Sequence, residues 1–222
     1  MRVLDLFCCG GGASRGLERA GFKVVGMDIE PQPGYPYEFR QGDALEADLR
    51  GFDLVWASPP CQGYSKHVSS QSSKWVPTLG KDEPRLIEPV RAMLRASGIP
   101  YVIENVRGAR DDLEAPFMLC GAMFGLPIAR HRYFEASWLV MSPPHVKCKG
   151  VAKGYAARHG WEYRDMSVTG KGRHAGTSER WKQILGIEPE AQMTQHQLAE
   201  SVPPAYAEFI ARSFLAQQRM AA

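Results

Sequence analysis

Short runs of apolar residues alternate with amphipathic stretches through the first half of the chain. The apolar runs at 3–7, 22–27, 53–58 and 101–104 predict buried strands, and shorter strands are expected near Phe39 and at 132–136. Helical patterns lie between them at 13–20 and at about 84–97, where we expect Pro89 to distort the helix. Alternating strands and helices predict an α/β fold with a mostly parallel sheet and helices on both of its faces.

The second half of the chain is less regular. Residues 64–81, rich in Ser and Lys, predict a mobile loop, and periodicity is lost after residue 136 until a closing helix at 205–217. The length of 222 residues fits one ordinary domain. We therefore predict one domain made of 1–135 and 185–222, interrupted by a small irregular insert at 136–184.

Composition narrows the class of protein. With 44% hydrophobic and 23% charged residues, the chain is typical of a soluble globular protein. It contains no apolar run of about 18 residues, and the charges of Arg2 and Asp5 argue against a signal peptide, so no membrane contact and a cytoplasmic location are expected. Five cysteines without a CxxC pair favour a reducing compartment and free thiols.

The net charge of +3 conceals a segregation along the chain. Residues 136–182 carry nine Lys and Arg against three Asp and Glu, a local charge of +6, so the rest of the chain carries −3. Histidines and aromatic residues lie between these cations, a mixture that neutralises phosphates and stacks on bases. A solvated irregular loop is an equally good interpretation of the charge alone.

A glycine-rich turn follows the first predicted strand, where parallel sheets commonly bind ligands. The dinucleotide fingerprint fails because Gly10 and Gly12 would require a glycine at Arg15. Asp28, after the second strand, and Asp43, after the third, are placed to accept hydrogen bonds from ribose and from an adenine amino group. The pattern favours S-adenosylmethionine over a nicotinamide cofactor, although both acids are also typical of turns and caps.

Three further strand ends carry reactive groups. Cys61 follows a strand stopped by two prolines, Glu104 ends the adjacent strand, and Arg130 and Arg132 precede another. A thiolate nucleophile, a carboxyl group and guanidinium donors at one sheet edge form a catalytic constellation. Taken singly, each residue is equally typical of a buried Cys, a strand-end Glu or a surface Arg.

Five ordered blocks resemble the motifs of C5-specific DNA cytosine methyltransferases, and most closely those of compact, phage-type members. The resemblance covers about residues 1–135 and 185–215. The blocks are Asp5 to Gly12, Pro59 to Ser65, Glu104 to Val106, Arg130 to Arg132, and Ser201 to Pro204.

The resemblance implies a class I S-adenosylmethionine-dependent methyltransferase fold and a covalent mechanism. Cys61 would attack C6 of a cytosine flipped out of double-stranded DNA, and Glu104 would engage N3 and the exocyclic amine. Arg132 would hold the cytosine O2, with Arg130 in support. The loop at 64–81 would close on the DNA, with Gln62 and Ser65 as substrate-binding residues.

The resemblance also implies a set of residues around S-adenosylmethionine. They come from the strand ends of the first half and from the last motif, which would return beside the first strand. They are Phe7, Gly10, Gly12, Asp28, Ile29, Asp43, Ala44, Ser201 and Val202.

Two departures from the family pattern stand out, Cys9 where a Gly is usual and Glu200 where an Asn is usual. The segment 136–184 is also much shorter than the usual recognition domain, so we expect a short recognition sequence, with Lys147, Lys149 and Arg173 contacting DNA. The expected setting is restriction-modification in a prokaryotic or phage-infected cell, with the protein acting as a monomer.

Three alternatives stay open. They are the same chemistry on RNA, modification of a free cytosine nucleotide, and a catalytically silent DNA-binding protein. The Cys-Phe-Thr tripeptide of the tRNA-modifying relatives is absent, whereas Cys61 and Glu104, which a silent protein would have lost, are present. No metal site is predicted, because His145 and Cys148 match no standard spacing with His159 and His174, and Cys120 is interpreted as a small buried residue.

Overall fold

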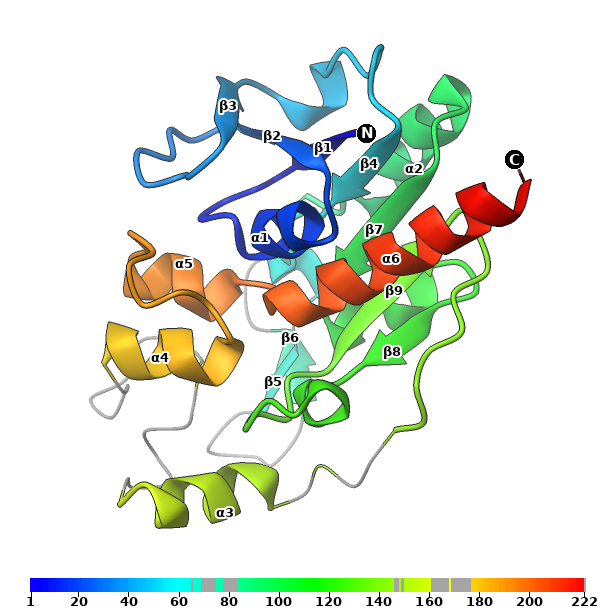
Figure 1. Ribbon diagram of the computed structural model, residues 1–222. Helices are drawn as coiled ribbons and strands as arrows, with labels where there is room; N and C mark the ends of the chain where they lie inside the picture. The colour runs from blue at the N-terminus through cyan, green and yellow to red at the C-terminus, as the bar shows by residue number, and fades with distance from the viewer. Residues whose placement is uncertain are drawn as a thin grey trace.

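The computed structural model of the chain describes residues 1–64, 66–68, 75–77, 84–145, 148, 150–160, 168 and 177–221. Within these residues, seven strands form one sheet in the order β3-β2-β1-β4-β7-β9-β8 (Figure 1). They are β1 (Arg2–Leu6), β2 (Lys23–Asp28), β3 (Glu38–Gln41), β4 (Leu54–Ala57), β7 (Tyr101–Asn105), β8 (Phe117–Leu119) and β9 (Arg132–Ala136). The first five in this order are parallel and β9 is antiparallel to both its neighbours, which confirms the predicted mostly parallel α/β sheet.

Helices cover both faces of this sheet. Those of the described residues are α1 (Gly12–Arg19), α2 (Ile87–Ser97), α3 (Val151–Arg158), α4 (Ser178–Leu185), α5 (Gln195–Glu200) and α6 (Pro204–Ala221). Figure 1 shows α1 and α6 side by side on one face, with α2 on the other and α3 farthest from the sheet. Four short 3-10 helices, also within the described residues, are η1 (Ala44–Glu46), η2 (Gln62–Tyr64), η3 (Arg107–Asp112) and η4 (Gly121–Phe124).

The central strands are buried on both faces. In β4, Leu54 and Trp56 join the core under α1 and α6, whereas Val55 and Ala57 join the core under α2. Successive side chains of a strand point to opposite faces, so a strand covered on both sides reads as an uninterrupted apolar run. This is why the strands of the first half were predictable from the sequence.

Two expectations about the elements are wrong, and one strand was missed. Pro89 does not break α2, because this helix begins at Ile87 and so Pro89 lies in its first turn, where the backbone N–H groups need no intrahelical partner. Within the expected loop at 64–81, β5 (Lys66–Val68) and β6 (Trp75–Pro77) form an antiparallel pair. The three-residue strand β8 was not predicted, because so short a run carries no clear period.

The expected insert at 136–184 is not irregular throughout. It contains α3 and nearly all of α4, and Ala156, Val168 and Trp181 from it share a third hydrophobic core with Leu198 of α5. The predicted boundary between residues 184 and 185 falls at the last residue of α4. The segment therefore packs directly on the C-terminal part of the chain.

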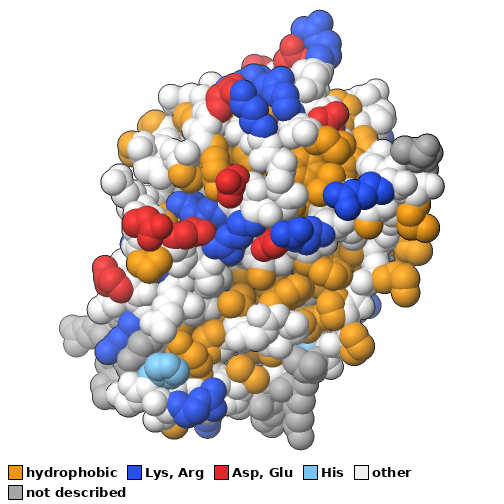
Figure 2. Space-filling model, in the orientation of Figure 1, with side chains coloured by type: hydrophobic (Ala, Val, Ile, Leu, Met, Phe, Trp, Pro, Cys, Tyr) orange, Lys and Arg blue, Asp and Glu red, His pale blue; other side chains and the backbone are white. Residues whose placement is uncertain are grey.

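Charges of both signs are mixed on the face that carries α1 and α6. Figure 2 shows acidic and basic side chains lying next to one another across it. Some form exposed pairs, such as Arg212 with Glu208, whose Nη2 and Oε1 atoms are 2.8 Å apart. This face therefore offers no continuous basic surface. None of the described helices is both long enough and apolar enough to cross a membrane.

Candidate active site

The carboxyl ends of the parallel strands meet around one cavity of about 680 Å³. Leu6 of β1 lies opposite both Met27 of β2 and Ala57 of β4, and Ala57 lies opposite Ile103 of β7. The residues that follow these positions are consequently brought to one edge of the sheet. Those of the predicted site that line the cavity are Phe7, Asp28, Ile29, Asp43, Ala44, Cys61, Gln62, Glu104 and Arg132.

The loop that carries Cys61 is held at both ends. Asn105 donates a hydrogen bond from Nδ2 to the carbonyl of Pro59 at 2.9 Å, and the backbone N–H of Tyr64 donates to the carbonyl of Cys61 at 3.1 Å. The hydroxyl of Tyr64 in turn accepts a hydrogen bond from the backbone N–H of Ile87 at 3.0 Å, at the start of α2. The half-buried Cys61 therefore lies on a fixed turn at the cavity wall.

Glu104 and Arg132 face the same cavity from adjacent antiparallel strands. The Arg132 Nε atom lies 3.1 Å from Glu104 Oε1, yet this oxygen has no aligned hydrogen-bond donor among the described residues. Burial raises the pKa of Glu104, whereas the Arg132 charge and a hydrogen bond from Ser58 lower it, and the net shift is upward. A buried carboxyl group with an unsatisfied oxygen is suited to hold a proton or to meet a donor from a ligand.

Arg130, expected to support the substrate, does not line the cavity. Its guanidinium group is buried and donates to the backbone carbonyls of Val168 and Ser201, at 3.0 Å each, and to that of Ala199. Burial and the nearby Arg132 lower the pKa of Arg130. This side chain therefore joins the 136–184 segment to the last motif, and its expected supporting role would be exerted through Arg132 rather than by contact with a ligand in the cavity.

The glycines of this turn pack against the last motif and the residues before it, whereas Phe7 and Cys9 of the same turn line the cavity. A Cβ atom on Gly12 would lie 2.6 Å from the carbonyl oxygen of Val202 and 3.0 Å from Ser201, and one on Gly10 would lie 2.7 Å from Met193. The backbone contact explains why glycine is needed at position 12, whereas a Cβ atom at position 10 would displace the flexible end of the Met193 side chain. None of Gly10, Gly12, Ser201 and Val202 lines the cavity, so direct contact with a cofactor is not visible for them.

The backbone of this turn carries strain next to the cavity. Phe7 and Cys9 adopt positive φ angles of 59° and 45°, a region that favours glycine. The Cys9 backbone N–H donates to Asp28 Oδ2 at 2.9 Å, so the turn is held against the end of β2. Cys9 stands where the family usually has a Gly, and holding a residue with a side chain in this αL conformation costs about 1 kcal/mol.

The two predicted acids both make local backbone contacts. Asp28 also accepts from the N–H of Glu30 through Oδ1 at 3.1 Å, and Asp43 Oδ1 accepts from Leu45 N at 2.9 Å, capping η1. The capping role left open for Asp43 is thus real, and both carboxylates still line the cavity. Ile29 beside them is 64% exposed, which is unusual for a large aliphatic side chain and leaves an apolar surface for a ligand.

Sequence reasoning missed the wall contributed by α5. Thr194, His196, Gln197 and Glu200 line the cavity, and Gln197 Nε2 donates to Gln32 Oε1 at 2.8 Å. Thr194 and Gln197 form a capping box, a sequence signal that predicts the start of this helix.

Glu200, which stands where the family usually has an Asn, lies directly across from Gln62. Its Oε1 accepts from Gln62 Nε2 at 3.4 Å, and its Oε2 lies 3.5 Å from His196 Nε2. Gln62 Oε1 has no partner among the described residues. The other predicted substrate-binding residues, Ser65, Lys147, Lys149 and Arg173, lie outside the described residues.

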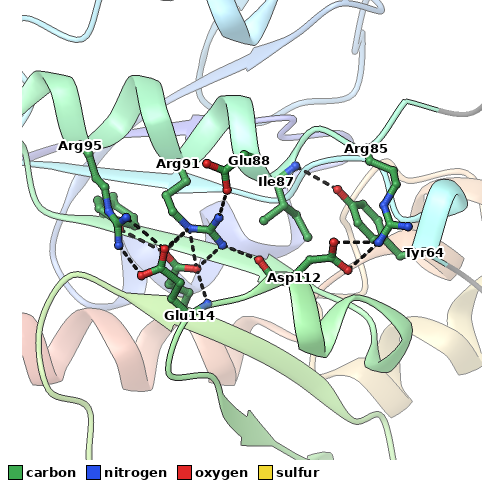
Figure 3. Close-up of polar contacts among 10 residues, drawn as sticks. Tyr64, Arg85, Ile87, Glu88, Arg91, Arg95, Asp112 and Glu114 are labelled. Atoms are coloured by element: carbon green, nitrogen blue, oxygen red, sulfur yellow. Dashed lines mark hydrogen bonds and ion pairs between the residues drawn. The ribbon is translucent and has the colours of Figure 1, made fainter.

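A network of ion pairs lies between α2, η3 and β9, next to the strands that carry Glu104 and Arg132. Figure 3 shows Arg85, Arg91 and Arg95 in a row along α2 and the residues before it, facing Asp112 and Glu114. Arg91 is buried and pairs with the buried Glu135 of β9 at 2.7 Å.

The same network reaches the Cys61 turn. The Arg85 guanidinium lies 4.7 Å from the centre of the Tyr64 ring and pairs with Asp112 at 2.7 Å. The Arg85 side chain therefore connects η2 to η3, and the ion pair of Arg91 with Glu135 connects α2 to β9.

Comparisons with known proteins agree with this geometry. A family model described as C-5 cytosine-specific DNA methylase matches residues 1–114. The Type II methyltransferase M.NgoMIV of Neisseria gonorrhoeae is 35% identical over 121 residues, which cover 49% of this chain and 36% of that protein. M1.HphI of Haemophilus parahaemolyticus is 34% identical over 82 residues, covering 29% and 22%. The chain thus spans well under half the length of the curated relatives that it matches.

Solved structures show the same fold over nearly the whole chain. A DNA modification methyltransferase encoded within an E. coli prophage aligns with a TM-score of 0.60 at 14% identity, covering 99% of both chains. DNMT2 of Spodoptera frugiperda aligns with a TM-score of 0.58 at 12% identity, covering 97% of this chain and 98% of that one.

Proposed function

Because the chain belongs to the C-5 cytosine-specific DNA methylase family, we propose that it transfers a methyl group from S-adenosylmethionine to C5 of a flipped-out cytosine in DNA. The observation that carries the proposal is the shared cavity of Cys61, Glu104 and Arg132, with the unsatisfied Oε1 of Glu104 facing it. A nucleophile, a proton-holding acid and a fixed cation are the groups that this reaction needs.

The proposed chemistry begins at C6. The Cys61 thiolate adds to C6, forming a carbon–sulfur bond and moving the C5–C6 electron pair towards C5. Glu104, whose pKa is raised by burial, gives a proton or hydrogen bond to N3, and its unsatisfied oxygen accepts from the exocyclic amine. Arg132 neutralises charge that develops at O2. Once C5 carries the methyl group that S-adenosylmethionine would supply, with S-adenosylhomocysteine left behind, loss of the C5 proton to water would let the C6–S bond break, which expels the Cys61 thiolate and restores the C5–C6 double bond.

The other end of the cavity fits the methyl donor. S-adenosylmethionine, when bound, supplies a methyl group on a positively charged sulfur. Asp28 and Asp43 offer carboxylate oxygens for ribose hydroxyls and the adenine amine, and the exposed Ile29 offers an apolar face for the adenine ring. Phe7 and Ala44 complete this wall. Gly10, Gly12, Ser201 and Val202 act from beneath it, by holding the turn in place.

DNA recognition is assigned to the basic segment 136–184. Its local charge of +6 contrasts with the mixed charges on the face of Figure 2. Lys147, Lys149 and Arg173 are proposed to contact phosphates, with Ser65 and Gln62 nearer the flipped base. So short a segment presents few side chains to base edges, so we propose a short recognition sequence.

Transfer of labelled methyl groups tests the proposal. Duplex DNA, tRNA and dCMP are incubated with the protein and labelled S-adenosylmethionine, and we expect incorporation into duplex DNA. Transfer to tRNA or dCMP instead would replace the DNA assignment, and no transfer to any substrate would favour the silent DNA-binding alternative.

The covalent step has its own test. DNA that carries 5-fluorocytosine should trap a denaturation-resistant adduct, because fluorine at C5 is not lost as a proton. Cys61→Ala should abolish the adduct and lower transfer by more than about 1,000-fold, while binding of S-adenosylmethionine by calorimetry is retained. An adduct formed by Cys61→Ala would overturn the assignment of the nucleophile.

A further inference from the structure

We propose that Cys120, His131, His145 and Cys148 form a tetrahedral zinc site that fixes the start of the 136–184 segment to the sheet. One ligand atom from each of the four side chains lies within 4.8 Å of all the others. This site goes beyond the methyl-transfer reaction and does not depend on it. No metal site was predicted from the sequence, because the four ligands are not arranged as two close pairs.

Two distances between ligand atoms of the cluster match the edges of a zinc tetrahedron. His131 Nε2 lies 3.4 Å from His145 Nε2 and 3.5 Å from Cys148 Sγ. Zinc bonds of about 2.0–2.1 Å to nitrogen and about 2.3 Å to sulfur separate two tetrahedral nitrogens by about 3.3 Å and a nitrogen from a sulfur by about 3.6 Å. The two rings meet edge to face, with an interplanar angle of 72°, and the Nε2–Nε2 distance shows that they approach through the same nitrogen.

Two of the ligands are brought together by the sheet itself. β8 and β9 pair antiparallel with Leu119 opposite Arg132, so Cys120 and His131, one residue further on, lie opposite each other. Cys120 is buried and begins η4, where its carbonyl accepts from Met123 N at 2.9 Å. These two positions are therefore rigid before any metal binds.

The other two ligands lie in the 136–184 segment, between the end of β9 and the start of α3. His145 and Cys148 have the short spacing H-x2-C, and the Cys148 carbonyl accepts from Val151 N at 3.2 Å, at the start of α3. A metal ion bound here would join α3 to β8 and β9. Two thiolates and two imidazoles in a tetrahedron select zinc among the common divalent ions.

The position of His131 connects this site to the cavity. The next residue is Arg132, which donates from Nη1 to the His131 carbonyl at 3.0 Å and reaches Glu104 on its other side. Fixing His131 through its imidazole therefore also fixes the backbone from which Arg132 reaches the cavity. The metal would thus hold both the recognition segment and this arginine in place.

Metal analysis of the protein, purified without a polyhistidine tag or chelator, tests the site. Mass spectrometry of the elements is expected to give about one zinc per chain. His145→Ala and Cys148→Ser should each reduce it to a small fraction of that value. His159→Ala is the matched control, because this histidine lies in the same segment but stacks on Tyr155, with ring centroids 4.0 Å apart, outside the cluster.

Cobalt substitution provides a readout that is independent of the variants' folding. Co(II) added to the metal-stripped wild-type protein should give the intense visible bands of a tetrahedral site and a thiolate charge-transfer band, and zinc should displace both. Limited proteolysis should cut the 136–184 segment faster after chelation. The proposal is overturned if neither zinc nor cobalt binds stoichiometrically, if Cys148→Ser retains full zinc, or if fresh protein contains a Cys120–Cys148 disulfide.

Discussion

The buried carboxyl group of Asp5 makes the stability of the protein depend on pH. Asp5 lies in β1 and is 1% exposed; its Oδ2 accepts a hydrogen bond from Ser14, but its Oδ1 has no partner among the described residues. Burial raises the pKa of Asp5 from 3.8 to about 7, partly offset by the Ser14 hydrogen bond and reinforced by the charge of Asp28. The folded protein therefore keeps this proton well above the pH at which the unfolded chain loses it.

The sign and size of the effect follow from linkage. Between the two pKa values the folded state binds more protons than the unfolded state, so the free energy of unfolding falls as pH rises. This loss of unfolding free energy is absent below the pKa that Asp5 has in the unfolded chain and is complete above about pH 7. A difference of about three pKa units corresponds to about 4 kcal/mol, of which roughly 3 kcal/mol falls between about pH 5 and about pH 8.

Urea denaturation of the wild type and of Asp5→Asn across this pH range measures the effect. The free energy of unfolding of the wild type relative to the variant should fall by about 3 kcal/mol from about pH 5 to about pH 8, since the amide does not titrate. Asp48→Asn is the contrasting control, because Arg50 lowers the pKa of this exposed carboxylate to about 2, so it is ionised in both states between about pH 5 and about pH 8 and its substitution should leave the pH dependence unchanged. A wild-type to Asp5→Asn difference that stays flat with pH would refute the reasoning.

Three further predictions concern the site and its support. Glu104→Gln keeps the shape of the side chain but cannot hold the proton for N3, so kcat should fall by at least about 100-fold while calorimetry shows unchanged S-adenosylmethionine binding; near-wild-type kcat would remove Glu104 from the mechanism. Arg91→Met leaves the buried Glu135 charge unpaired and should lower the free energy of unfolding by about 3–5 kcal/mol in urea, whereas Arg212→Met, in an exposed pair, should cost less than about 1 kcal/mol; equal costs would contradict the argument. Tyr64→Phe removes the acceptor for the first N–H of α2 and should cost about 1 kcal/mol in the same assay, with an unchanged value contradicting the cap.

The central part of the fold and its reactive edge were predictable because local patterns decide them. β1, β2, β4 and β7 are buried on both faces, so each is a continuous apolar run bounded by turn residues. Once these strands are parallel, Asp28, Cys61 and Glu104 must meet at their carboxyl ends. No information about distant packing is needed for that step.

Other features depend on contacts between distant segments and were not predictable. Arg130 was expected to support Arg132 at the substrate, but it precedes β9, and its partners Val168 and Ser201 are 38 and 71 residues away in the sequence, so no local pattern indicates them. The metal cluster depends on the pairing of β8 with β9, and β8 is only three residues long. A one-dimensional spacing rule does not detect ligands that a sheet register brings together.

The contacts around Arg130 and His131 bear on how a small recognition segment serves the reaction. The 136–184 segment meets the rest of the chain at the proposed metal cluster, at the hydrogen bond from Arg130 to Val168, and in the core where Trp181 packs with Leu198. The first two contacts are made by His131 and Arg130, the two residues that directly precede Arg132. If the segment binds DNA as proposed, its displacement would be transmitted through Arg130 and His131 to the backbone that carries this arginine. Such coupling would let a short segment align Arg132 with Glu104 and Cys61 in the cavity when DNA is bound.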